Sequence, residues 1–404
     1  MNIFDLPTFF VFAAFADGTV PTEETINVLQ TGTAAMFLNF VAFALGATVG
    51  SFLNVCIYRI PLEQSVNDPK RSFCPSCKYA IPFYHNIPLV SWLLLRGKCA
   101  NCKTPFSMRY WWVELLTAVV FLIIWRWVGG VENWQMAIVY WVFLAMLITA
   151  TFIDFEHFII PDGITIGGTI VGIVAGLAVP QIMGTGNHLH GLGLSALGAT
   201  VGFGLLYAVV ILGKIMFGRK TKKFAEPVNW KITQEGDDEN PTLTVGDTPN
   251  PWEDIFFCGT EFMRLDVPEM ELNGTDYKNV KVEVHLDHVL IDEERTELAN
   301  LKTITGKTKH QLYSREAMGF GDVKFLAMIG AFLGWQAVLF TVFLASVAGT
   351  LVALPLRFIG KQEWSSRIPF GPYLALGGVV WLFFGKDLVD WYFGLLQSAR
   401  EGAL

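Results

Sequence analysis

Long apolar runs separated by short polar segments dominate the chain. About 18 apolar residues cross about 30 Å of hydrocarbon, since a helix rises about 1.5 Å per residue. The sixth run is short and the fifth is rich in glycine, which favours close packing against neighbouring helices. The runs predict eight spans, at about 34–58, 112–128, 134–153, 162–180, 192–217, 321–334, 336–357 and 371–395.

Residues 218–317 interrupt the apolar pattern. They open with the basic stretch "GRKTKK", typical of a cytoplasmic membrane surface, and continue through the acidic "TQEGDDENPTLTVGDTPNP", which indicates a linker. In "NVKVEVHLDHVLI", Val and Leu alternate with polar residues at period two, which predicts strands. We expect a small soluble insertion rich in β-structure. A disordered acidic loop remains an alternative, because the hydrophobic content is thin.

Composition and charge agree with a membrane protein. The chain is 52% hydrophobic and 16% charged, whereas soluble domains carry about 25% charged residues. The net charge of −7 argues against nucleic acid as a partner.

Basic residues predict the orientation. The segment after the first span is rich in Lys and Arg, which the positive-inside rule assigns to the cytoplasm. Alternation of the spans then places 154–161, 218–320 and 358–370 on the cytoplasmic side as well. The loops "GGVEN" and "QIMGTGNHLHG" carry no Lys or Arg and are predicted to lie outside.

Two CxxC pairs follow the first span: Cys74 and Cys77, then Cys99 and Cys102. Four thiolates arranged tetrahedrally suit structural zinc and leave no open position for water. A cytoplasmic location disfavours disulfides, although paired disulfides or a redox CxxC remain alternatives. The other two cysteines are Cys56, expected to be a buried structural thiol, and Cys258, which has no evident partner.

These patterns together predict an all-α polytopic membrane protein of about eight transmembrane helices, with a small cytoplasmic zinc-binding domain and the soluble insertion. The apolar run "PTFFVFAAFA" near the N-terminus lacks the basic residues that precede a signal peptide's core, so we expect an interfacial segment rather than a cleaved signal. The expected division is a periplasmic or interfacial segment at 1–33, the first transmembrane helix at 34–58, the cysteine domain at 59–111, helices two to five at 112–217, the insertion at 218–317, helices six to eight at 318–395, and a tail at 396–404.

Two aspartates lie where apolar helices meet polar segments. Asp322 follows two glycines in "MGFGDVKFLAMIGAFLG", and Asp154 ends the third span in "LITATFIDFEHFIIPDGIT". A carboxylate in the bilayer costs about 2.5–3.5 kcal/mol, so it is usually paired or functional. Two carboxylates held together at the same membrane boundary can share a proton, as in aspartic proteases. The alternatives are a first-turn acid at Asp322 and a headgroup-solvated residue at Asp154.

Neighbouring residues compete for these roles. Asp162 follows Pro161 and is expected to begin the fourth span, while Glu156 and His157 are expected in an exposed loop. Neither an HExxH nor a GxSxG motif occurs, so the sequence gives no support for an intramembrane metalloprotease or a serine hydrolase.

Several stretches together resemble the bifunctional type IV prepilin peptidases, also called leader peptidase/N-methyltransferases. The resemblance is carried by "GATVGSFLNVCIYRIP", the cysteine segment, "IDFEHFIIPD", "GFGDVKFLAMIGAFLGW" and "IPFGPYLALGG". It implies Asp154 and Asp322 as the catalytic pair. The residues that support these motifs are Gly319, Gly321, Lys324, Pro161 and Asp162.

The resemblance also implies an activity and a location. The family cleaves the leader of prepilins and pseudopilins after a glycine at the cytoplasmic face of the bacterial inner membrane, then methylates the new N-terminus with S-adenosylmethionine. No Gly-rich fingerprint for the methyl donor is visible, so its binding residues stay unassigned. Expected partners are prepilins and the lipid bilayer, with self-association left open.

The chain departs from the family in one respect, and two other functions remain as alternatives. The family joins the fifth and sixth spans by a short loop, whereas the insertion here could be a lid, a substrate selector or a neutral addition. A proton-coupled transporter would also use membrane acids, although such acids usually lie near the midplane within inverted repeats. In a non-enzymatic zinc-bearing component of a pilus or secretion machine, both aspartates would be dispensable.

Overall fold

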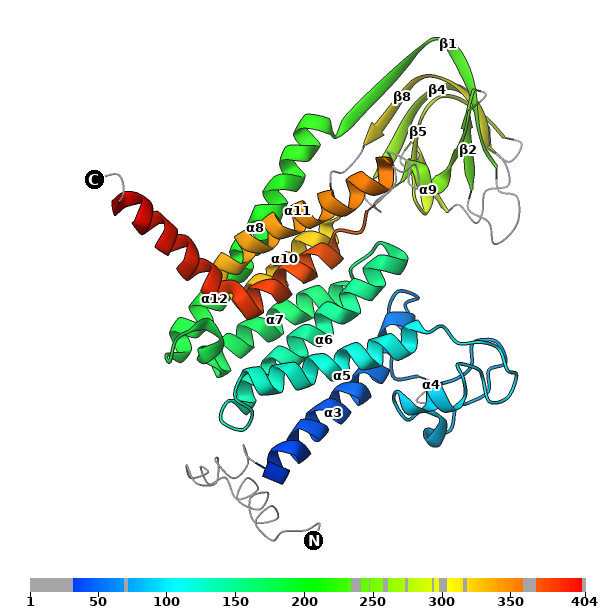
Figure 1. Ribbon diagram of the computed structural model, residues 1–404. Coiled ribbons are helices and arrows are strands. Elements are labelled where there is room, and N and C mark those ends of the chain that lie inside the picture. Colours follow the sequence, from blue (N-terminus) through cyan, green and yellow to red (C-terminus); the bar gives the residue numbers. More distant parts are fainter. Residues whose placement is uncertain are drawn as a thin grey trace. The chain divides into compact units, whose positions relative to one another are not determined.

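The structure is a computed structural model that forms two compact units, Met1–Phe203 with Lys324–Leu404 and Gly204–Val323 (Figure 1). The expectations for residues 1–31 and for Cys258 lie outside the described residues. The described residues are 32–68, 72–233, 241–246, 248–256, 261–272, 275–292, 294–297, 304–314, 318–358 and 368–401.

Each of the eight apolar runs forms one helix. Six of these helices are long and apolar enough to cross a membrane, and α7 and α10 are shorter. The polytopic membrane fold is therefore confirmed. The helices are α3 (Gly32–Arg59), α5 (Arg109–Trp127), α6 (Trp134–His157), α7 (Asp162–Ala178), α8 (His188–Phe217), α10 (Phe320–Leu333), α11 (Trp335–Phe358) and α12 (Gly371–Glu401).

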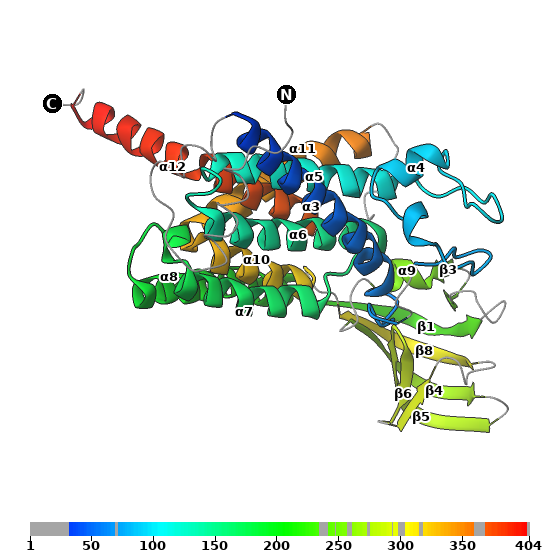
Figure 2. The same ribbon diagram turned by 90° about the horizontal axis from the view of Figure 1, so that it is seen from below.

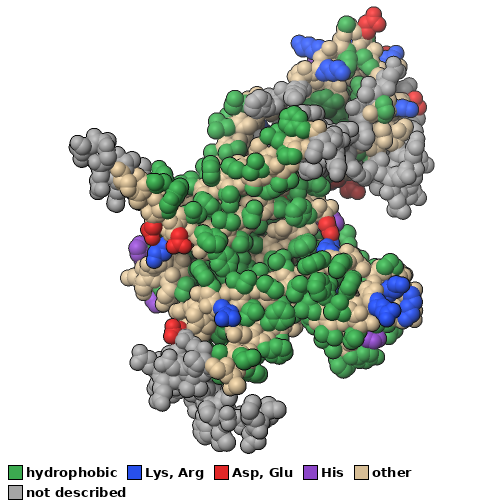
Figure 3. Space-filling model, viewed as in Figure 1, with side chains coloured by type: hydrophobic (Ala, Val, Ile, Leu, Met, Phe, Trp, Pro, Cys, Tyr) green, Lys and Arg blue, Asp and Glu red, His purple; other side chains and the backbone are tan. Residues whose placement is uncertain are grey.

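The outer surface of the helices is apolar. Large side chains such as Phe343 and Leu351 of α11 are 66% and 68% exposed, and hydrophobic groups cover the helices in Figure 3. A soluble protein rarely exposes so continuous an apolar surface, so lipid is its expected surrounding.

Helix α10 is the short span and its interior is enclosed. Phe325, Leu326, Met328 and Ile329 are all fully buried. A β-carbon on Gly198 of α8 would lie 2.1 Å from the backbone oxygen of Gly330, so the two helices approach with backbone against backbone. The predicted close packing of the short and Gly-rich spans is present, and it explains how a helix of 14 residues fits among longer ones.

The segment between α3 and α5 holds the cysteines and two short helices, η1 (Phe83–His85) and α4 (Val90–Leu94). A further 3-10 turn, η2 (Pro180–Met183), joins α7 to α8. Figure 2 shows the α4 region as a lobe beside the ends of α3 and α5. Lys and Arg side chains gather at the outer end of this lobe in Figure 3.

The insertion is an eight-stranded antiparallel sheet in the order β3-β2-β1-β8-β4-β5-β6-β7. Its buried face is apolar, with Trp230, Leu243, Met263, Val282 and Val284 among the most enclosed side chains. The strands are β1 (Arg219–Thr233), β2 (Thr242–Val245), β3 (Thr248–Pro251), β4 (Phe262–Leu272), β5 (Thr275–His285), β6 (His288–Ile291), β7 (Glu294–Glu297) and β8 (Ile304–Ser314), with the short helix α9 (Trp252–Ile255) after β3.

The all-α fold class is therefore only partly right, and the disordered-loop alternative is wrong for the described residues. The period-two segment forms β5 and β6 as predicted. The basic "GRKTKK" stretch runs into β1, and part of the expected linker forms β2 and β3. Prolines did not prevent this, because Pro249 and Pro251 lie on the edge strand β3, where proline is tolerated.

Candidate active site and metal centre

Asp154 lies in the last turn of α6 and is 5% exposed. Its Oδ2 accepts a hydrogen bond of 2.9 Å from the backbone N–H of Gly371, the first residue of α12. The helix ends just beyond, where Phe158 adopts a left-handed φ of 55° and its N–H donates to the Asp154 carbonyl at 3.0 Å. This burial does not fit the headgroup-solvated alternative for Asp154.

Gly371 is a site residue that the sequence analysis did not identify. A β-carbon on Gly371 would lie 2.6 Å from Asp154 Oδ2 and 2.9 Å from Ile160 Cδ1. Any side chain would therefore displace the carboxylate or break its hydrogen bond. The available signal was the Gly-Pro pair at the start of an apolar run in "IPFGPYLALGG".

Asp322 lies in the first turn of α10, as predicted. Its backbone N–H donates to the Gly319 carbonyl at 3.2 Å, and its side chain is half-buried. A β-carbon on Gly319 would lie 3.6 Å from Asp322 Oδ2, so the carboxylate lies beside the backbone of this glycine. Phe320 at the helix start contacts Tyr207 of α8 edge to face, with ring centroids 6.2 Å apart.

Lys324 follows in the same helix and bonds to Asp162. The distance from Lys324 Nζ to Asp162 Oδ1 is 2.6 Å. Asp162 begins α7 directly after Pro161, which has an extended backbone. The family resemblance named Pro161, Asp162 and Lys324 as residues that support the aspartate motifs. In the structure, Lys324 and Asp162 are in direct contact.

Glu156 and His157 belong to α6 and not to a loop. The Glu156 carboxylate pairs with the Arg109 guanidinium at the start of α5. His157 is exposed, as expected.

The four cysteines converge. Their sulfur atoms all lie within 4.8 Å of one another, and they form the one His, Cys, Asp and Glu group of three or more, within the described ranges, that could hold a metal ion. Cys74 Sγ lies 3.7 Å from Cys102 Sγ, and Cys77 Sγ lies 4.0 Å from Cys99 Sγ. Four sulfurs at about 2.3 Å from a tetrahedral zinc would be separated by about 3.8 Å, so the cluster fits this ion.

Both CxxC loops have the same backbone turn. The N–H of Lys78 donates to the Cys74 carbonyl, and the N–H of Lys103 donates to the Cys99 carbonyl. Lys78 and Lys103 adopt left-handed φ values of 58° and 62°. The repeated turn points both cysteines of each loop to the same side, which is how the spacing creates a four-sulfur cluster.

The thiols differ in electrostatics. Hydrogen bonding to Thr104 lowers the pKa of Cys102 to about 6, and Thr104 Oγ1 lies 3.2 Å from this sulfur. Burial raises the pKa of Cys74. A bound metal favours the thiolate form of all four.

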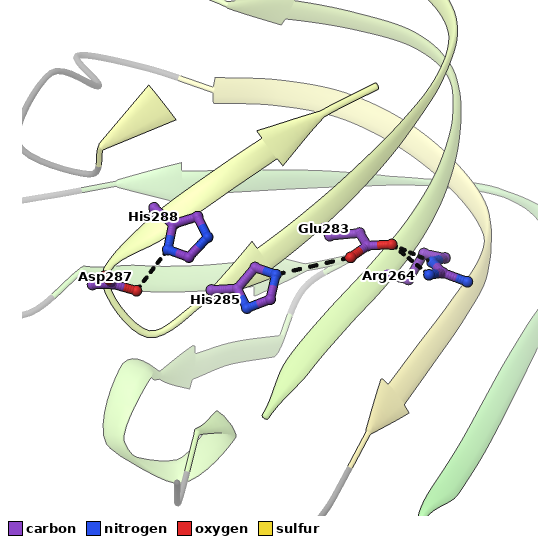
Figure 4. A network of polar contacts seen from close by, with 5 residues as sticks. All are labelled: Arg264, Glu283, His285, Asp287 and His288. Carbon is purple, nitrogen blue, oxygen red and sulfur yellow. Dashed lines mark hydrogen bonds and ion pairs between the residues drawn. The ribbon is translucent and has the colours of Figure 1, made fainter. Parts of the chain in front are cut away.

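The sheet carries a separate polar network, drawn in Figure 4. Arg264 on β4 pairs with Glu283, its direct partner on β5. The rings of His285 and His288 stack with centroids 4.4 Å apart. Burial lowers the pKa of His285, and the hydrogen bond to His288 lowers the pKa of Asp287. These contacts join neighbouring strands, and we assign no chemistry to them.

Two family profiles match the chain. The Bacterial Peptidase A24 N-terminal domain matches residues 44–128, and the Type IV leader peptidase family matches 141–220 and 290–354. The second match omits residues 221–289, which form most of the sheet.

Curated relatives match over most or part of the chain. A prepilin leader peptidase/N-methyltransferase of Aeromonas hydrophila is 26% identical over 87% of this chain and 92% of its own length. One from Legionella pneumophila is 24% identical over 89% and 95%. A third, from Myxococcus xanthus, is 42% identical over 40% of this chain and 44% of its own length. No solved structure matches.

Proposed function

This chain belongs to the type IV leader peptidase family, and from that premise we propose that it is a membrane aspartic endopeptidase and N-methyltransferase. It cleaves the leader of prepilins and pseudopilins after a glycine and methylates the new N-terminal residue. The observation that carries the cleavage proposal is Asp154, a carboxyl buried at a helix end with one oxygen held by the Gly371 N–H.

Asp154 and Asp322 act as a pair in this proposal. One carboxylate takes a proton from water while the other, protonated, polarises the scissile carbonyl. Held close together they share a proton, because two adjacent carboxylates do not readily ionise together. The Gly371 N–H fixes the direction of the Asp154 carboxyl, so that its other oxygen is available to water or substrate.

The ion pair of Lys324 and Asp162 supports the approach of the two aspartates. It joins α10, just after Asp322, to the start of α7, which closely follows Asp154 in the chain. A β-carbon on Gly319 would meet only the Asp322 carboxylate, at 3.6 Å, so this glycine leaves space for the backbone of an extended substrate peptide. Gly321 is proposed to serve the same role.

The metal and the methyl donor have separate roles. Cys74, Cys77, Cys99 and Cys102 hold a structural zinc ion that fixes the two loops to each other. S-adenosylmethionine supplies the methyl group that is transferred to the N-terminal amine.

The site faces the cytoplasm of a bacterial inner membrane, and the expected division of the chain at 33, 58, 111, 217, 317 and 395 is retained in this proposal. The Lys and Arg residues of the cysteine lobe support this orientation, since basic loops remain cytoplasmic. A prepilin is a membrane helix with a basic leader, so its cleavage point would meet the bilayer at this surface. Self-association of the protein stays open.

Substitution of the aspartates tests the function. We expect Asp154→Asn and Asp322→Asn each to lower the rate of prepilin cleavage by about 10²–10⁴-fold, the usual contribution of a general acid or base. The measurement is leader cleavage by purified protein in detergent, with Asp390→Asn on the exposed part of α12 as the control. Full cleavage by either variant would exclude the aspartic peptidase and leave the assembly component as the better reading.

A further inference from the structure

A cavity lies between α3, α5 and the loops that carry the cysteines. Its volume is about 160 Å³. An engineered apolar cavity of about 150 Å³ admits one benzene ring, so this one offers room for a flat ring. Its walls include Asn54 and Arg59 from α3, His85 from η1, Trp92 from α4, and Trp111 and Glu114 from α5.

Four of the residues that line this cavity each have a buried polar atom with no hydrogen-bond partner within the described part of the chain. The atoms are Asn54 Oδ1, His85 Nδ1, Trp92 Nε1 and Trp111 Nε1. Asn54 is 3% exposed, and its Nδ2 already donates to the Tyr110 carbonyl at 3.0 Å, which leaves the Oδ1 unsatisfied. About 90% or more of buried polar groups have partners. Four exceptions among the residues that line one cavity therefore favour a ligand that, after small side-chain movements, supplies the missing bonds.

The four atoms define the chemistry of that ligand. The indole N–H groups of Trp92 and Trp111 can only donate, Asn54 Oδ1 can only accept, and His85 Nδ1 does either according to its tautomer. A purine with an exocyclic amine offers both kinds of partner, since its ring nitrogens accept and its amine donates. An aliphatic occupant such as a lipid chain would leave all four atoms unsatisfied.

The aromatic and charged side chains of the cavity also suit a purine ligand. The rings of Trp92 and Trp111 have centroids 6.5 Å apart and offer faces on which a flat base can stack. The Glu114 carboxylate accepts a 2.7 Å hydrogen bond from the N–H of Leu89, whose φ is 63°. This φ is unfavourable for leucine, and such backbone strain is concentrated at binding sites. A carboxylate and aromatic faces together attract a cation such as a sulfonium.

We propose that this cavity binds the adenine ring of S-adenosylmethionine, an inference that rests on the proposed N-methylation. Asn54 accepts from the exocyclic amine, the two indoles donate to ring nitrogens, and Glu114 attracts the sulfonium. Phe73 and Lys98, which directly adjoin Cys74 and Cys99, also line the cavity. The metal-bound loops thus form one wall of the donor site, which gives the cysteine cluster a connection to methyl transfer.

Trp111→Phe is the test variant, because it removes one indole N–H and keeps an aromatic face. Its neighbour Trp112 is 52% exposed and does not line the cavity, so Trp112→Phe is a matched control. Binding of S-adenosylmethionine, S-adenosylhomocysteine and adenosine is measured by calorimetry on the full chain in detergent, without prepilin. Trp92→Phe is the second variant, and thermal unfolding checks that each protein is folded.

We expect Trp111→Phe or Trp92→Phe to weaken all three ligands by about tenfold, and Trp112→Phe to change them by less than about twofold. Binding by the unmodified protein that neither cavity variant weakens would place the donor elsewhere, and no binding of any of the three would also overturn the proposal. Cleavage and methylation of prepilin by the unmodified protein are measured separately. Loss of the proposed function is therefore distinguishable from failure of the cavity assignment.

Discussion

The helical unit and the inserted sheet differ in what they bury. The helices enclose groups capable of chemistry, such as Asp154 and Asn54, which are 5% and 3% exposed. The hydrophobic cluster of the sheet is apolar. The sheet also buries polar side chains, such as Gln311, which is 2% exposed and donates a hydrogen bond to Tyr313 within the sheet. Burial of polar groups is unfavourable unless they are paired or used. From this comparison we propose that function is concentrated in the helices, whereas the polar groups of the sheet serve its own stability.

Among the changes that test this comparison, the largest loss of activity is expected from substitution of Gly371 in the helical unit. Gly371→Ala places a methyl carbon 2.6 Å from Asp154 Oδ2, which is too close for the carboxylate to stay in place, and a misplacement of about 1 Å can lower a rate by about 10²-fold. We therefore expect prepilin cleavage to fall by about 10²-fold, measured with purified protein. Gly394→Ala is the control, because Gly394 lies in the same helix with no atom within 4 Å of the added carbon. Equal rates for both variants would contradict the assigned role of Gly371.

The cysteine cluster is expected to separate the two activities. The double substitution Cys74→Ser and Cys77→Ser removes two of the four thiols that could hold a metal ion, and we expect it to loosen the wall of the cavity beside α3 and α5. We expect methylation to fall by about tenfold or more and cleavage to change less. We would measure the metal content by elemental analysis, and the rates of cleavage and methylation on the same prepilin. Equal loss of the two activities would show that the lobe does not act on methylation alone.

The pair of Lys324 and Asp162 is expected to contribute modestly. Asp162 is 61% exposed in its side chain, and exposed ion pairs contribute about 0.2–1 kcal/mol. We expect Lys324→Met and Asp162→Asn each to reduce cleavage by about two- to fivefold. In the double variant the losses should not add, because both changes remove the same contact. Additive losses would show that the two residues act independently.

The smallest effect is expected for removal of the sheet. Lys223 on β1 is the direct partner of His310 on β8, so a two-residue Asn-Gly turn can replace residues 224–309 and close a short hairpin. We expect cleavage to stay within about twofold of the intact protein, because the hydrophobic cluster of the insertion contains only residues of the insertion itself. A large loss of rate or an altered choice of prepilin would instead support a lid or substrate selector.

The sequence predicted the helices well, because such long apolar runs are stable only as helices in a membrane or in the protein interior. It also predicted β5 and β6, whose alternation is local. It did not predict β1. The basic stretch "GRKTKK" has no alternation of apolar and polar residues, and it becomes a strand by pairing with β8, which lies far along the chain. The bond from Gly371 to Asp154 was missed for the same reason, since 217 positions separate the two residues. Such pairings depend on tertiary approach and leave no local pattern.

The limited length of α10 has a consequence for hydrolysis. Its 14 residues, at about 1.5 Å each, reach about 21 Å, which is less than about 30 Å of hydrocarbon. Since longer helices enclose α10, its short end can form the floor of a recess lined by protein rather than by lipid, and the aqueous phase then extends below the level of the headgroups. Such a local depression would let solvent wet the Asp322 end of the helix, so the nucleophile that breaks the peptide bond need not cross lipid to reach it.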